Sequence, residues 1–73
     1  MNTAQRNEVT KKALGIATIH FQYYRQGRSH WLVTMNDGEV HTLALPNLAT
    51  ESTVLREMAE RLAKSGRAVK YPA

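Results

Sequence analysis

The 73-residue chain contains no cysteine, which excludes disulfide bonds and zinc sites with thiolate ligands. No apolar stretch approaches the roughly 20 residues of a membrane helix. The first eight residues have no apolar segment of the kind that a secretory signal requires. We therefore expect a cytoplasmic protein. A chain this short buries only about 60% of its unfolded surface, so its stability must come from a small core, helped by a partner or a second copy.

Acidic residues are in the minority, with six Asp and Glu against ten Lys and Arg, a formal charge of +4 and a pI near 9.9. This excess favours anionic partners without identifying one. The cations are spread along the chain and form no run of five residues, so there is no polybasic arm. Internal repeats and low-complexity tracts are absent as well.

The first fourteen residues are mostly polar, and their apolar positions between residues 2 and 13 are only Ala4, Val9 and Ala13. Thr3 is a suitable helix cap, but the apolar stripe is thin. We interpret residues 1–14 as a short helix or a polar arm. Residues 15–73 are then a single compact domain.

Three strands are predicted after this segment. Residues 16–25 alternate with period two and are rich in β-branched and aromatic side chains, and residues 30–35 and 40–45 continue the pattern. Residues 26–29 supply the first turn, and the Asp37-Gly38 pair favours a tight second hairpin. Pro46 ends the third strand because it has no amide donor.

A helix is predicted over residues 50–64, because one apolar stripe recurs at spacings of one, three and four. The stripe consists of Val54, Leu55, Met58, Ala59 and Leu62. Thr50 or Ser52 is expected to cap the start, and Gly66 stands where a glycine commonly follows a helix. Residues 67–71 form a short final strand in this reading. The fold class is α+β, a three-stranded antiparallel β-meander packed by one C-terminal helix.

The turns set the expected register. A two-residue turn at Asp37-Gly38 pairs Leu32 with Leu43, and a tight first turn pairs Phe21 with Leu32. One face then carries Ala17, Ile19, Phe21, Tyr23, Leu32, Leu43 and Leu45, against which the helix packs. The expected core is Phe21, Leu32, Leu43, Leu55, Met58 and Leu62. The other face carries Thr18, His20, Gln22, Tyr24, Trp31, Val33, Met35, Val40 and Thr42, and it is apolar enough that we expect a homodimer.

Catalytic and metal chemistry have little support. In this register His20 lies on one face while His30 and His41 lie on the other, with no facing pair to hold a metal ion. Ser29 and His30 are consecutive, so their side chains point to opposite faces and cannot share a proton. The four glycines have no phosphate-binding spacing. We expect no enzyme, no cofactor and no metal.

Trp31 is either a core residue or, with Tyr24 and His20, part of an exposed sheet surface flanked by Arg25 and Arg28. The second reading predicts a small non-enzymatic nucleic-acid-binding module in which the aromatic rings contact bases. The cations that contact phosphates are then Arg25, Arg28, Lys64, Arg67 and Lys70. The alternative is a protein that binds and inhibits or adapts another protein through the same surface.

Two outlines resemble known families. The sheet with one helix is similar to the sheet-type DNA-binding domains of phage and transposon integrases. With a helical N-terminus, the order α-β-β-β-α is that of double-stranded RNA-binding domains. The Lys-Lys-x-Ala-Lys motif that opens their last helix is absent, and residues 50–54 read Thr-Glu-Ser-Thr-Val. The small, cysteine-free chain is also similar to phage or mobile-element inhibitors such as anti-CRISPR proteins, which act by protein-protein contact.

Overall fold

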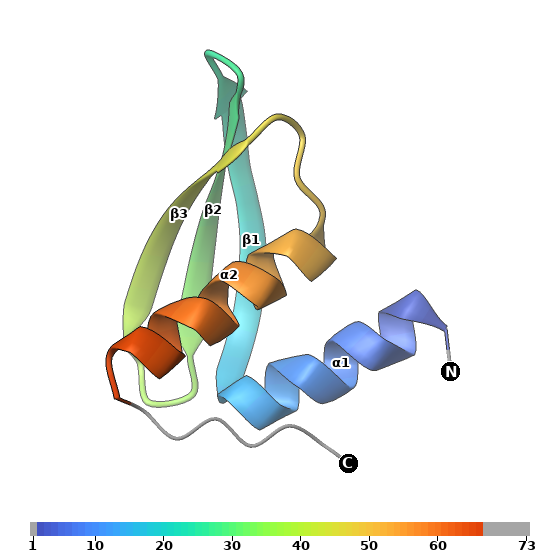
Figure 1. Cartoon of the computed structure of the whole chain (residues 1–73), viewed down its shortest axis with the longest axis vertical. Helices are drawn as coiled ribbons and strands as arrows, with labels where there is room; N and C mark the ends of the chain where they lie inside the picture. Colours follow the sequence, from blue (N-terminus) through green and yellow to red (C-terminus); the bar gives the residue numbers. More distant parts are fainter. Residues whose placement is uncertain (1, 67–73) are drawn as a thin grey trace.

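The computed structural model describes residues 2–66 and contains two helices and three strands (Figure 1). The strands form one antiparallel sheet in the order β1-β2-β3. This arrangement confirms the predicted α+β fold with a β-meander. The predicted strand at residues 67–71 lies outside the described residues. The elements are α1 (Thr3–Leu14), β1 (Ile16–Arg25), β2 (Arg28–Met35), β3 (Val40–Pro46) and α2 (Glu51–Lys64).

The N-terminal segment is a 12-residue helix, α1, although its sequence has only a thin apolar stripe. A capping box explains its start: the Asn2 side chain accepts from the Gln5 amide at 2.9 Å, and the Gln5 side chain accepts from the Asn2 amide at 3.0 Å. The cap is therefore Asn2, not Thr3. Gly15 ends the helix in the left-handed region with φ 76°, a conformation that glycine adopts without a steric penalty.

Helix α2 follows the predicted stripe closely. Val54, Leu55, Met58 and Leu62 are all buried. The helix begins after Thr50, whose side chain makes no capping hydrogen bond, and Gly66 follows its end with φ 79°. The spacing of the apolar residues therefore identified both the helix and its buried face.

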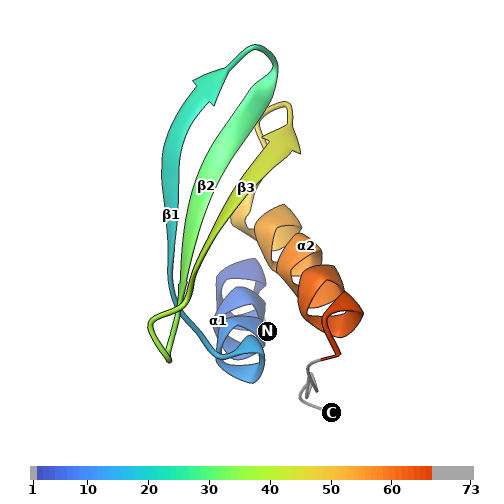
Figure 2. The ribbon, with the colours of Figure 1, turned by 90° about the vertical axis from the view of Figure 1, so that its left-hand side faces the viewer.

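Both helices lie on the same side of the sheet, which leaves its other side uncovered by the described residues (Figure 2). The core lies between the two layers. Its buried residues are Leu14, Ile16, Val33, Met35, Leu43, Leu45, Val54, Leu55, Met58 and Leu62. No helix within residues 2–66 is long and apolar enough to cross a membrane.

The first hairpin turns at Gln26 and Gly27, which have φ values of 52° and 74°. Positive φ at both central residues is what a type I′ turn requires, and it pairs Arg25 with Arg28 as expected. The register then shifts between Phe21 and Tyr23. Phe21 consequently pairs with Trp31, one residue away from the predicted partner.

The second hairpin differs from the prediction. Met35 N donates to Glu39 O at 2.8 Å, so residues 36–38 form a three-residue connection instead of a two-residue turn. Gly38 takes φ 91°, and Asp37 Oδ1 accepts from Glu39 N at 2.9 Å. The sheet register moves by one, and Leu43 pairs with Trp31 instead of Leu32.

This shift reverses the predicted orientation of β2, because neighbouring residues of a strand point to opposite faces. Trp31, Val33 and Met35 face the helices, and Leu32 points to the uncovered side. Of the predicted core, Leu43, Leu55, Met58 and Leu62 are confirmed as buried. The prediction of burial is wrong for Phe21 and Leu32, because Phe21 is 43% exposed and Leu32 is only partly buried.

Candidate functional site

The candidate site lies on the uncovered side of the sheet, here called the open face. Cross-strand partners share a face, and the register therefore places three rows of side chains on it. The rows cross β1, β2 and β3 in that order, and they consist of Thr18, Thr34 and Val40; His20, Leu32 and Thr42; and Tyr23, His30 and Ala44.

The charge of this face is one-sided. None of the three strands contains an Asp or a Glu. The exposed side chains of Arg25 and Arg28 stand at the β1–β2 turn. Asp37 and Glu39 belong to the β2–β3 turn, at the other end of the sheet (Figure 1). An anion that approaches the open face near the first hairpin therefore meets cations and no carboxylate from the sheet.

A pair of stacked rings stands near the cationic end of this face. The rings of Tyr23 and His30 lie 4.3 Å apart between centroids, with an interplanar angle of 15°. The irregularity between Phe21 and Tyr23 explains this position, because the extra residue turns Tyr23 to the open face. Tyr23 remains 49% exposed, so the stack presents aromatic surface to solvent.

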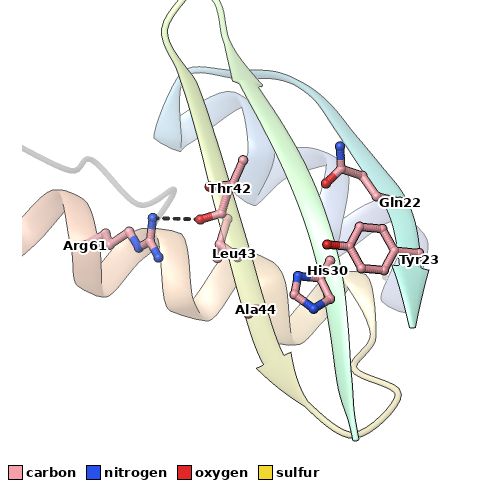
Figure 3. Close-up of a pocket in the computed structure, with 7 residues that line it drawn as sticks. All are labelled: Gln22, Tyr23, His30, Thr42, Leu43, Ala44 and Arg61. Atoms are coloured by element: carbon pink, nitrogen blue, oxygen red, sulfur yellow. Dashed lines mark hydrogen bonds between the residues drawn. The ribbon is translucent and has the colours of Figure 1, made fainter. Parts of the chain in front are cut away.

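A hollow of about 520 Å³ lies beside the stack, close to the edge of the sheet at β3 (Figure 3). Arg61 reaches this edge from α2, and its Nη1 donates to Thr42 O at 3.2 Å. Ala44, on β3, contributes only a methyl group. The lining residues are Gln22, Tyr23, His30, Thr42, Leu43, Ala44 and Arg61. The hollow thus has an arginine at one end and two rings at the other (Figure 3).

Two of the predicted aromatic site residues are not on the open face. Tyr24 pairs with Ser29, so it lies on the side of the helices, where it is 48% exposed. Trp31 lies on that side as well, half-buried, with its ring edge-to-face against Phe21 at 5.2 Å. The prediction of an exposed surface made by Trp31 and Tyr24 together with His20 is therefore wrong.

A buried hydroxyl holds the Trp31 ring on the helix side. Ser29 is fully buried, and its Oγ accepts from Trp31 Nε1 at 3.0 Å and from Ala49 N at 3.2 Å. The same hydroxyl donates to Leu45 O at 3.4 Å. Ser29 on β2 thereby bonds both the Trp31 indole and the loop between β3 and α2.

The predicted cations fall into separate groups. Arg25 and Arg28 are brought together at the tip of the first hairpin. Lys64 is exposed at the end of α2, far from that tip (Figure 1). Arg67 and Lys70 lie outside the described residues. Of the predicted cations within residues 2–66, Arg25 and Arg28 therefore lie next to the open face and Lys64 does not.

The histidines also divide between the two faces of the sheet differently from the prediction. His20 and His30 share the open face, while His41 lies on the helix side with its Nε2 2.6 Å from Glu39 Oε1. No group of three potential metal ligands occurs within residues 2–66.

Sequence reasoning missed Tyr23, His30 and Arg61 as a group. The irregularity in β1 has no clear sequence signal. Arg61 belongs to the predicted helix, and only the structure shows that its hydrogen bond goes to β3.

Comparison of the chain with protein-family models, with curated proteins and with solved structures finds no significant match. Any function assigned to the chain therefore depends on the geometry of the open face and of the first hairpin.

Proposed function

We propose that the protein is a small non-enzymatic nucleic-acid-binding module that uses the open face and the tip of the first hairpin. The supporting observation is the exposed Tyr23–His30 stack on a three-stranded sheet that contains no carboxylate. Open antiparallel sheets with exposed rings bind bases by stacking, and arginines beside them bind phosphates.

The arginines have distinct positions around the rings. Arg25 and Arg28 are directly opposite each other across the β1–β2 turn, so two residues of like charge are cross-strand partners. Such a pair is unfavourable in the free protein. A phosphate between the two side chains relieves the repulsion and accepts hydrogen bonds from both. The hairpin tip is therefore the best-placed phosphate contact in the described part of the chain.

Fluorescence anisotropy of labelled DNA and RNA oligonucleotides tests the proposal. Trp31 is a poor reporter because it lies on the side of the helices. We expect affinity to fall steeply between about 50 and 200 mM salt, because phosphate contacts release counterions. Replacing Arg25 and Arg28 by Gln should reduce the slope of log affinity against log salt by about 1.4–1.8.

Lys12→Gln with Arg56→Gln is the matched control, since both side chains are exposed cations on the helices and the net change in charge is the same. This control should leave the slope nearly unchanged. Absence of oligonucleotide binding by the parent protein at low salt contradicts the proposal.

A protein partner is the second candidate, and one observation favours it. Phe21 and Tyr24 are 43% and 48% exposed on the helix side of the first hairpin, next to the half-buried Trp31. Exposed aromatic side chains are common at the centre of protein interfaces. A phage or mobile-element inhibitor, similar in action to anti-CRISPR proteins, is the form that this candidate takes. It predicts a complex that Phe21→Ser weakens and that salt affects mainly through the association rate.

A further inference from the structure

We propose that the hollow beside the Tyr23–His30 stack is the binding site for one nucleotide of a single strand. Its base packs against the two rings, and its phosphate binds Arg61. This inference depends on the proposed nucleic-acid function and adds the substrate class, an unpaired strand, and the position at which one nucleotide is held.

The shape of the hollow supports one nucleotide. Its volume is about 520 Å³, within the range of about 300–1,000 Å³ that is usual for small-molecule sites. The small side chain of Ala44 leaves the space open between His30 and Arg61, which lie on either side of it (Figure 3). A larger residue at this position would occupy the space directly.

The chemistry of the lining matches the two parts of a nucleotide. The Arg61 guanidinium carries five N–H donors, and its hydrogen bond from Nη1 to Thr42 O, at 3.2 Å, holds the group at the edge of the sheet. Its remaining donors suit a phosphate, which guanidinium binds in a bidentate manner. At the other end, Tyr23 and His30 supply ring surface, and the Gln22 amide offers both a donor and an acceptor to a base edge.

The same rings favour a single strand over a duplex. A side-chain ring stacks only on a base whose face is accessible, and paired bases in a duplex cover one another's faces. The stack lies on a broad sheet and not on a helix that enters a groove. We therefore expect the hollow to be filled by unpaired nucleotides and to remain empty when a duplex is offered.

Ala44→Leu is the first test, because the exposed Ala44 lies outside the core and its replacement fills the hollow. Anisotropy with a labelled single-stranded 12-mer should show affinity reduced about fivefold or more, the loss typical of one stacked base. Thr18→Leu is the control: it adds apolar bulk to the open face away from the hollow and should change affinity less than twofold. Circular dichroism establishes that both variants fold.

Two matched pairs identify the ends of the site. Tyr23→Ala should weaken single-strand binding by about fivefold or more, whereas Tyr24→Ala removes an equally exposed ring from the other side of the sheet and should have little effect. Arg61→Gln should weaken binding and reduce the salt slope by about 0.7. Arg56→Gln, an exposed arginine on the same helix that does not line the hollow, should do neither.

The outcomes separate this inference from the proposed function. If the parent protein binds no oligonucleotide, the proposed function fails. If it binds, but a duplex of the same length binds as tightly or Ala44→Leu binds like the parent, the hollow is not the site and the general function survives. Equal losses for Tyr23→Ala and Tyr24→Ala likewise overturn the assignment of the base to the stack.

Discussion

The side chain of Ser29 joins Trp31, the end of β3 and the β3–α2 loop. Its hydroxyl is fully buried and takes part in three hydrogen bonds, with Trp31 Nε1, Ala49 N and Leu45 O. A hydroxyl has one donor and two acceptor positions, so all of its capacity is used. These bonds keep Trp31 on the side of the helices, and they fix the loop that leads from β3 to α2.

At the residue scale we predict that Ser29→Ala destabilises the fold by about 1–3 kcal/mol or more, because the Trp31 indole N–H and the Ala49 amide lose their acceptor. Urea unfolding monitored by Trp31 fluorescence measures the change. Ser65→Ala is the control, since Ser65 is exposed and its hydroxyl donates only to Leu62 O within the last turn of α2. An equal loss of unfolding free energy in the two variants would show that the Ser29 hydrogen bonds stabilise the fold no more than the Ser65 bond does.

The helices and the strands differ in what determines which side chains are buried. The stripe of α2 is set by local spacing, and its buried residues agree with the sequence pattern. Helix α1 has a weak stripe, yet it is tied to α2 by a hydrogen bond from Ser52 Oγ to Asn7 Oδ1 at 3.1 Å. The strands depend on turn length and on the irregularities of β1, and a change of one residue in either exchanges the two faces.

The register is testable at the scale of the element. Leu43→Ala should lower the free energy of unfolding by about 2–5 kcal/mol, because the side chain is buried beneath α2. Leu32→Ala, on the neighbouring strand, should cost clearly less since Leu32 lies partly exposed on the open face. Chemical denaturation of both variants measures the two losses of unfolding free energy. A larger cost for Leu32→Ala would restore the register that the two-residue turn implies.

Residues 2–66 form two layers, a sheet and a pair of helices, and none of these residues covers the outer face of the sheet. The expectation of a homodimer came from an uncovered face that contained Trp31, Val33 and Met35. These side chains face the helices instead, and the open face carries mainly threonine, histidine and tyrosine side chains. The homodimer stays a prediction, and the exposed Phe21 and Tyr24 on the helix side of the first hairpin are a candidate interface for it.

Light scattering after size-exclusion chromatography, at micromolar concentration, tests the oligomeric state directly. A dimer has twice the chain mass of 8.2 kDa, and Phe21→Ser should shift it toward the monomer if that surface forms the interface. A single species of 8.2 kDa at all concentrations contradicts the homodimer. The same measurement with and without oligonucleotide shows whether nucleic acid and a second copy compete.

The sequence by itself determined the fold class and the order of the three strands and α2. Period-two alternation, turn residues and the stripe of α2 are local signals, and each acts over a few residues. The approximate limits of β1, β3 and α2 follow from them, as do the buried Leu55, Met58 and Leu62. The positive charge at the hairpin tip was also evident, because Arg25 and Arg28 flank a tight turn.

The tertiary structure decided which face of the sheet each side chain joins. The three-residue turn at 36–38 and the irregularity after Phe21 each shift the strand pairing by one residue, and neither was identified from the sequence. They turned Ser29 and Trp31 toward the helices and brought Tyr23 against His30. The physical reason is that successive side chains of a strand point to opposite faces of the sheet. The candidate site therefore depends on a register that only the packed molecule fixes.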